Sequence, residues 1–202
     1  GSAMAPFYTV LCLWVGALIL AAIVNVNITN PAFKEFKLWQ QYFGRSMTFS
    51  LMGILQALVA SLGDIYLLHI QCLSPLKFVL ICVACSYTFC KIVYTLTIAL
   101  DDVGKAIAVI LLVMQVAGSG GTFPSEVMPK FFQVINSVLP FRFGLAATRE
   151  CIAGMYGDIY WKNVLLEVAY VPPCIIIGLL TWKKLYKAKS YFRRKMEETG
   201  IM

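Results

Sequence analysis

Five stretches of this chain are long and apolar enough to cross a lipid bilayer, and this feature constrains its fold more than any other. A spanning helix needs about 20 mostly apolar residues, because hydrocarbon offers no partner to its backbone N–H and C=O groups. The composition, with 60% hydrophobic and 13% charged residues, excludes an ordinary soluble domain and favours an all-α, polytopic membrane protein. The five stretches cover residues 6–24, 46–70, 78–100, 106–122 and 163–182.

The fourth stretch ends in a run that should break a helix at membrane depth. A polar amide, three glycines, a proline and an acidic residue interrupt the apolar pattern: Gln115, Gly118, Gly120, Gly121, Pro124 and Glu126. Irregular backbone is tolerated inside a bilayer only where neighbouring protein or a wet cavity satisfies its polar groups. The break therefore predicts a multi-helix bundle with an interior surface.

Residues 123–162 are too polar to span the bilayer and too apolar for an ordinary loop. Large apolar residues recur there at helical spacing ahead of Pro140: Phe131, Phe132, Ile135, Val138 and Leu139. This pattern predicts short amphipathic helices. We expect them to be external, re-entrant helices that dip back into one face of the membrane.

Basic residues set the predicted orientation, because cytoplasmic flanks of spans retain Lys and Arg. With the first end placed outside, eleven of the seventeen Lys and Arg residues fall on inner segments, and the densest cluster lies in a basic cytoplasmic tail over residues 183–202. Residues 1–4 resemble an expression scar, which leaves residues 5–182 as the transmembrane domain. Five spans then require an external N-terminus, so we expect a missing upstream part with a further span and an external domain.

Residues 30–43 predict an amphipathic helix on the inner surface. Pro31 suits a first helical turn, and Phe33, Phe36 and Trp39 recur every three residues. Two interpretations remain open. The helix floats in the headgroups, which periodicity alone favours, or it is a coupling helix that docks a cytosolic partner such as an ATPase.

Isolated polar residues inside spans are functional candidates, because each costs a few kcal/mol unless it is paired or wet. Counted from the span ends, Gln56, Lys91 and Gln115 fall at one depth and predict a polar layer near mid-membrane. The alternative is interhelical hydrogen bonding that only holds the bundle, with Lys91 reaching inward along its stem.

Further polar residues are expected near the outer ends of the spans. Asp64 and Glu167 fall there, in reach of basic residues such as Arg149, and with Glu150 they predict an outer charged cluster. Pro172-Pro173 should kink the last span, since proline removes backbone donors.

No catalytic or metal-binding pattern stands out. Seven cysteines lie mostly in apolar surroundings, where Cys behaves as a small buried hydrophobe, although Cys72 and Cys151 both fall outside and a disulfide between them stays open. The glycine run at 118–121 lacks the Lys and Ser/Thr of a nucleotide site. We expect no enzyme activity and no cofactor, and the net charge of +7 lies on membrane flanks, which does not favour nucleic acid.

Several motifs resemble the C-terminal membrane region of the YhgE/Pip (phage infection protein) family, within the ABC-2-type permease superfamily. They are Ala5-Pro6-Phe7, Leu13-Trp14-Val15-Gly16, the run from Gln115 to Pro124 with Glu126, and Leu139-Pro140-Phe141 followed by Arg149-Glu150. The resemblance implies a six-span subunit with an external domain after its first span, of which this chain holds spans two to six. It also implies a coupling helix at 31–43 and re-entrant helices at 123–161.

Two functions follow as expectations. The resemblance implies a permease in a bacterial cell membrane that works as a homodimer among membrane lipids, with an ATPase subunit, and exports a lipid, polymer or hydrophobic compound. The competing hypothesis is a membrane anchor or scaffold that holds an external domain used as a phage receptor. A continuous polar layer facing a cavity favours transport, and a tightly packed apolar interior favours anchoring.

Overall fold

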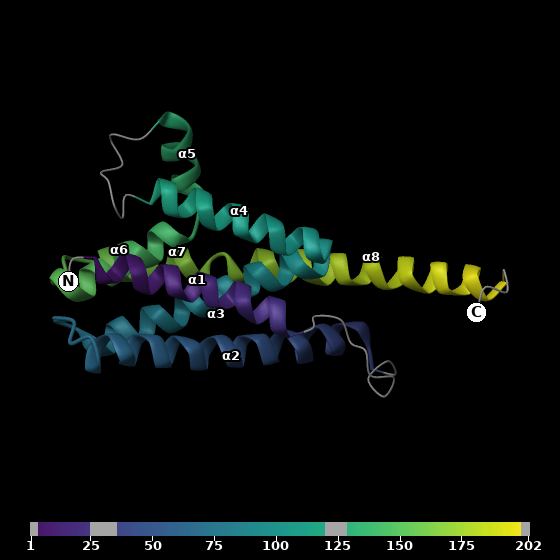
Figure 1. Cartoon of the computed structure of the whole chain (residues 1–202), viewed down its shortest axis with the longest axis horizontal. Helices are drawn as coiled ribbons and strands as arrows, with labels where there is room; N and C mark the ends of the chain where they lie inside the picture. The colour runs from purple at the N-terminus through teal and green to yellow at the C-terminus, as the bar shows by residue number, and fades with distance from the viewer. Residues whose placement is uncertain (1–3, 25–35, 120–128, 199–202) are drawn as a thin grey trace.

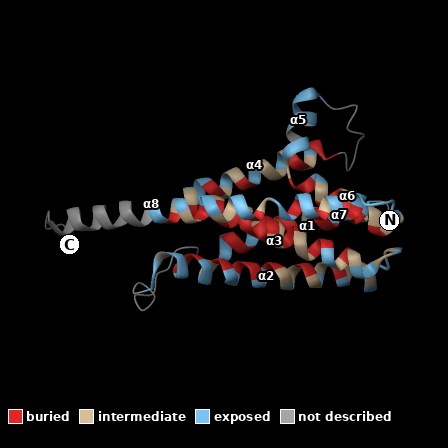
Figure 2. Cartoon of the chain, turned by 180° about the vertical axis from the view of Figure 1, so that it is seen from behind, coloured by how far each residue is buried: buried red, intermediate tan, exposed pale blue. Residues whose placement is uncertain are grey.

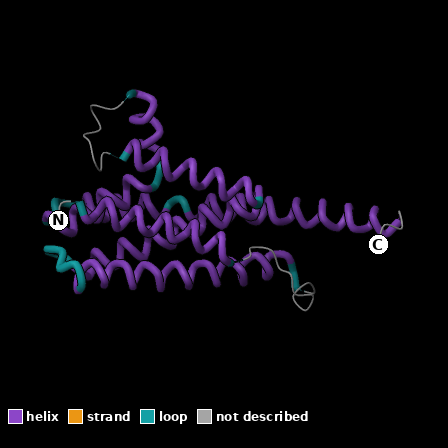
Figure 3. The backbone as a smooth tube through the Cα atoms, viewed as in Figure 1, coloured by secondary structure: helices purple, strands orange, loops and turns teal. Residues whose placement is uncertain are grey.

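The structure, a computed structural model, describes residues 4–24, 36–119 and 129–198. Within these ranges every element is a helix or a loop, which confirms the all-α class (Figure 3). The helices are α1 (Ala5–Ile23), α2 (Leu38–Tyr66), α3 (Pro75–Leu100), α4 (Asp102–Gly118), α5 (Lys130–Val138), α6 (Phe141–Ala153), α7 (Ile159–Val168) and α8 (Val171–Glu198).

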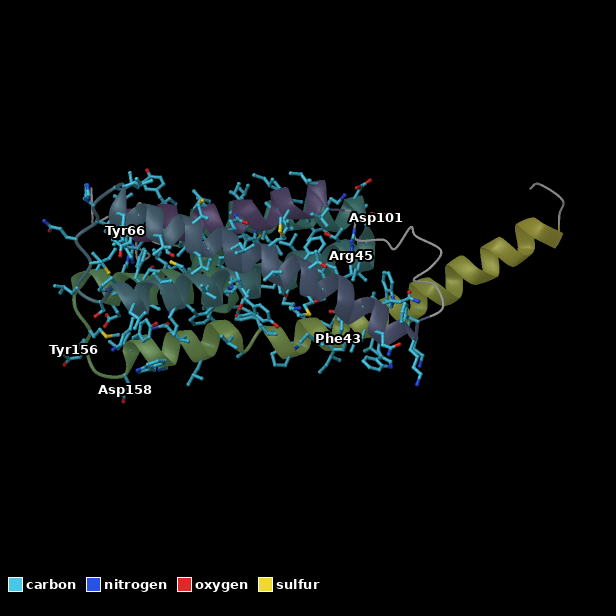
Figure 4. All side chains as sticks on the ribbon, turned by 90° about the horizontal axis from the view of Figure 1, so that it is seen from below. Phe43, Arg45, Tyr66, Asp101, Tyr156 and Asp158 are labelled. Carbon is cyan, nitrogen blue, oxygen red and sulfur yellow. The ribbon has the colours of Figure 1, made fainter. Side chains whose placement is uncertain are left out.

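The long helices run roughly side by side, with α3 at the centre in contact with α1, α2, α4, α6, α7 and α8 (Figure 1). Tyr66, Tyr156 and Asp158 lie at one end of this bundle, and Phe43 and Asp101 lie at the other (Figure 4). Following the predicted orientation, we name the end with Tyr66, Tyr156 and Asp158 the outer end and the end with Phe43 and Asp101 the inner end. The start of α1 and the end of α8 lie at opposite ends (Figure 1).

Four helical segments in the described part of the chain are long and apolar enough to cross a membrane. They are Ala5–Ile23, Trp39–Tyr66, Pro75–Leu100 and Ile159–Lys184. The fourth predicted span corresponds to α4, which has 17 residues and is shorter than the length of about 20 that a bilayer demands. The count of five spans therefore stays a prediction.

The bundle surface is apolar along its length. One stripe on α2 consists of Met47, Leu51, Leu55, Val59 and Leu62, each between 42% and 75% exposed. Exposed positions recur on the outward faces of the other long helices (Figure 2). Soluble proteins rarely expose contiguous apolar patches of this extent, so this surface fits lipid rather than water.

The inner end of α2 differs from the sequence-based expectation. Residues 38–43 are the first turns of α2 itself, so they do not end a separate surface helix. Phe36 and Trp39 are 52% and 54% exposed, whereas Pro31 and Phe33 lie outside the described residues. Gly44 lies between Trp39 and the apolar span, but an isolated glycine inside a helical pattern weakens a helix without ending it, so α2 runs through this position.

The predicted break after the fourth stretch is partly described. Gly118 is the last residue of α4, which confirms that the helix stops at the glycine run. Gly120, Gly121, Pro124 and Glu126 lie outside the described residues. The short helix expected ahead of Pro140 is confirmed as α5, which ends at Val138.

The turn between α3 and α4 holds the tightest backbone approach among the described glycines. Asp101 alone separates the two helices and has a φ of 54°. A Cβ atom on Gly104 would lie 2.0 Å from the Leu96 carbonyl oxygen. Because backbone atoms cannot rotate away, only glycine fits at this position.

We predict that Gly104→Ala lowers the free energy of unfolding by about 1 to 3 kcal/mol, because the added methyl group forces α3 and α4 apart. Gly44→Ala in α2 is the matched control, since nothing lies within 4 Å of its Cβ position. The control should leave stability unchanged or raise it by about 0.5 to 1 kcal/mol. Unfolding in mixed micelles measures both, and equal stabilities of the two variants would contradict the crowding at Gly104.

Candidate functional site around α6

The short helix α6 lies in the outer half of the bundle, packed against α1, α3 and α7. It follows Pro140 and ends before Gly154, whose φ of 114° suits glycine alone. Its buried face recurs at helical spacing and consists of Phe141, Gly144, Leu145, Ala147, Thr148 and Cys151. Arg142 and Arg149 lie on its exposed face. This amphipathic pattern sets α6 into the bundle with its charges outward.

Gln115 of α4 accepts a hydrogen bond from a backbone N–H group at the start of α6. Its Oε1 atom accepts a hydrogen bond from the Phe141 backbone N–H at 3.2 Å, and both residues are fully buried. The first N–H groups of a helix have no intrahelical partner, so a buried start needs such an acceptor. The Nε2 atom of Gln115 has no hydrogen-bond partner. The polar residue that precedes the glycine run therefore anchors the next inserted helix.

Gly144 lets α6 approach α3 and α1. A Cβ atom there would lie 2.5 Å from the Cys85 Sγ atom of α3. Beside this contact lies the side chain of Glu167 from α7, which is fully buried. Neither of its carboxyl oxygens has a hydrogen-bond partner, although the Gly144 backbone lies close by. An acidic group is thus held in an apolar setting between three helices.

The last span is interrupted directly after Glu167. Helix α7 ends at Val168 and α8 begins at Val171, so the helix breaks ahead of Pro172-Pro173. The kink predicted from these prolines is confirmed. The hydroxyl of Tyr170, in the turn, donates to the Val138 carbonyl at the end of α5.

Two threonines of α3 satisfy carbonyl groups on either side of this break. Thr88 donates to the Glu167 carbonyl oxygen at 3.3 Å, and Thr95 donates to that of Cys174 at 3.1 Å. They are seven residues apart and so share a face of α3. These hydroxyls join α3 to both parts of the divided last span, in a setting where protein groups rather than water must satisfy backbone polar atoms. Sequence reasoning missed both residues, since a threonine in an apolar helix carries no pattern of its own.

The three residues expected to form one polar layer lie at different depths. Lys91 donates to the Ser46 hydroxyl of α2 and lies 5.1 Å from the centre of the Tyr87 ring. Gln56 follows Ser46 by ten residues, which places it roughly 15 Å farther outward along α2. Its amide lies where a Cβ atom on Gly16 of α1 would be.

The third residue, Gln115, lies farther out still, because its partner Phe141 packs against Phe7 near the start of α1 with ring centres 6.0 Å apart. In the described structure these three side chains therefore do not share one depth. Residues that are equally far in sequence from their span ends do not lie at equal depths, because the helices differ in tilt and in where they begin. These contacts fit the alternative, in which polar groups hold neighbouring helices together.

Two members of the predicted outer charged cluster have hydrogen-bond partners outside it. The Thr9 hydroxyl donates to Asp64, and the Glu150 Oε2 atom accepts from the Tyr156 N–H at 2.8 Å. Arg149 lies on the exposed face of α6. Glu167 lies deeper than expected, beside Thr88, roughly 20 Å along α3 from its outer end. The last span begins at Ile159 rather than at the predicted residue 163, so Glu167 lies farther from its outer end than expected.

Two cysteines meet at the outer end of α6. The Cys72 thiol donates to the Cys151 carbonyl oxygen at 3.3 Å, and the Ser74 N–H donates to the same oxygen at 3.1 Å. All seven cysteines are free thiols in this structure. Burial raises the pKa of the Cys72 thiol and raises that of Cys151 to about 12, with the neighbouring Cys72 adding to the latter shift.

Comparison with curated proteins gives one informative similarity. Over 183 residues the chain is 27% identical to the uncharacterized protein YhgE of Bacillus subtilis (strain 168). The match covers 90% of this chain and 23% of that protein, so the chain spans less than a quarter of its relative. No protein-family model matches the chain. No solved structure matches it significantly.

The contact between Lys91 and Ser46 predicts a non-additive pair. Ser46→Ala should cost about 1 to 3 kcal/mol of stability, because it leaves a buried ammonium without its hydroxyl partner. In a Lys91→Met background the same substitution should cost less than about 0.5 kcal/mol, since no donor remains to be satisfied. Unfolding of the four proteins of this cycle measures the coupling. Equal costs in both backgrounds would show that the two side chains do not interact.

Cys151 should react slowly at neutral pH. A maleimide attacks thiolate, and a pKa near 12 leaves little thiolate at pH 7, so the labelling rate should rise about tenfold per pH unit above neutrality. The measurement uses a variant in which Cys151 is the single cysteine. Tyr156→Cys in a cysteine-free background is the control, because Tyr156 is 78% exposed. Comparable rates for both cysteines at pH 7 would contradict the raised pKa.

Proposed function

We propose that this chain is the membrane domain of a YhgE/Pip-type permease of the ABC-2 class, which exports a lipid, polymer or hydrophobic compound across a bacterial cell membrane. The arrangement around α6 carries the proposal. A short helix is set into the outer half of the bundle before the last span, and the buried Gln115 satisfies its first turn. This is the kind of re-entrant element that the resemblance implies. The similarity to YhgE over 90% of the chain supports the same assignment.

The interior of a single copy does not favour a transport route. Aromatic rings fill the space between α1, α2 and α3, with Trp14 and Phe89 centres 4.8 Å apart and Phe49 and Tyr94 centres 5.0 Å apart. The polar residues lie at separate depths, each against a neighbouring helix. We therefore propose a route between two copies in a homodimer, bordered by lipid. The exposed Phe36 and Trp39 at the inner end would dock an ATPase subunit.

The same packed interior favours a second function. A bundle filled by rings and interhelical hydrogen bonds is well suited to hold an external domain at the membrane surface without moving a solute. In that case α6 only fills space in the outer half of the bundle, and Gln115 contributes to stability alone. The two proposals differ in whether any compound crosses the membrane.

Proteoliposomes that contain the full-length protein and its candidate ATPase test this difference. Two probes are used, a fluorescent phospholipid and a fluorescent hydrophobic cation, with and without ATP. For a permease we expect ATP-dependent movement of at least one probe, and a loss of movement in Gln115→Leu, because removing the acceptor destabilises the start of α6 by about 1 to 3 kcal/mol. Gln56→Leu is the matched control, since Gln56 lies away from α6. Movement of neither probe by a correctly folded protein would overturn the permease and support the anchor.

A further inference from the structure

Glu167 is the most anomalous side chain in the described structure. It is fully buried, and both carboxyl oxygens lack a hydrogen-bond partner. An ionised carboxylate in such a place costs several kcal/mol unless a cation or donors compensate it. The Thr88 hydroxyl of α3 does not compensate the charge, because it donates to the Glu167 backbone carbonyl and not to the carboxyl group.

The groups that face Glu167 from neighbouring elements supply no counter-charge. From α3 the facing titratable group is the Cys85 thiol, and in the turn after α7 it is the Tyr170 phenol. Arg142 of α6 lies nearer to Tyr170 and has an exposed side chain. Neutral thiol and phenol groups do not offset a carboxylate charge.

The buried cation Lys91 interacts with groups other than Glu167. Lys91 lies three residues beyond Thr88 on α3, but its ammonium group donates to Ser46 on α2 and lies against the Tyr87 ring. A buried lysine and a buried glutamate therefore occupy one helix bundle without forming an ion pair. A pair would have been the usual way to lower the cost of both charges.

A metal ion is an unsuitable ligand for this place. Hard cations take six or more oxygen ligands, and no group of three His, Cys, Asp or Glu residues lies together in the described ranges. The Thr88 hydroxyl is already used on a backbone carbonyl. A proton needs only one carboxyl oxygen, and it removes the charge entirely.

We propose that Glu167 is a proton-binding site within the last span, and that binding or release of this proton shifts the packing of α6 and α7 against α3. The described packing suits the protonated side chain, because the buried carboxyl group has no cation or donor against its oxygens. After the proton leaves, the carboxylate must gain donors or water. The groups at hand are the Gly144 backbone of α6 and the interrupted turn at Tyr170, which also holds the end of α5. Ionisation therefore acts on α6 and on the break between α7 and α8.

Proton binding at Glu167 does not depend on a transported compound, so it is compatible with both a permease and an anchor. Infrared difference spectroscopy of the full-length protein in nanodiscs, between about pH 5 and about pH 9, detects the carbonyl stretch of a protonated carboxyl group. We expect a carboxylic acid band at neutral pH that Glu167→Gln lacks. Glu150→Gln is the matched control and should retain the band, because Glu150 is only partly buried. Absence of a Glu167 band at neutral pH, or a band that responds to sodium rather than pH, would overturn the proposal.

A distance measurement tests the coupling to α6. Spin labels at Ala153→Cys on α6 and Leu76→Cys on α3, both exposed positions, report the separation of these helices. The separation should change between acidic and alkaline pH with Glu167, remain fixed in Glu167→Gln, and change again in Glu167→Asp. Gln has the shape of the protonated side chain, so this variant should fold. A pH-dependent change that persists in Glu167→Gln would assign the movement to another group and overturn the coupling.

Discussion

The absence of water inside a membrane is the constraint on which this structure depends, because every interrupted helix must find its missing hydrogen-bond partners on a neighbour. Gln115 meets that demand at one interruption, and two threonines of α3 add hydrogen bonds beside another. Gln115 accepts from the start of α6, while Thr88 and Thr95 donate to carbonyls beside the break between α7 and α8. Two of the three belong to α3, which also contacts most other helices. The central helix therefore stabilises the bundle through apolar packing and makes broken helices tolerable at its surface.

The sequence predicted where helices lie along the chain better than how they join and pack against one another. Apolar runs located the long helices because burial in lipid demands the same composition along a whole span. The glycine run and Pro172-Pro173 marked real ends because these residues act on their own backbone. The start of α2 was missed, since Leu38 and Trp39 continue an amphipathic pattern and Gly44 alone does not end the helix. Periodicity reports that a segment is helical, but it does not report where one helix merges into the next.

The candidate site was largely beyond sequence reasoning for a related reason. Depth counted along each span assumes straight, parallel helices, whereas Lys91 carries its charge along a flexible stem to Ser46 and Gln115 meets a helix that begins 26 residues later. Glu167 was placed near the outer surface because the last span was taken to begin at residue 163. The span begins at Ile159, and the Glu167 backbone lies beside Thr88. The sequence thus identifies polar residues in a membrane bundle as candidate functional residues, but their interaction partners depend on tertiary packing.

The two halves of the chain differ in how they are built. Helices α1, α2 and α3 run unbroken for 19, 29 and 26 residues, and aromatic rings fill the space between them. Beyond α4, three helices of 9, 13 and 10 residues precede α8. Packed cores resist continuous deformation, whereas turns between short helices absorb backbone rotation at low cost. The unpaired carboxyl of Glu167 lies on the boundary, between a rigid half that holds α3 and a segmented half that can rearrange around it. A change of charge at that boundary acts on the segmented half, because the rigid half has no break to open.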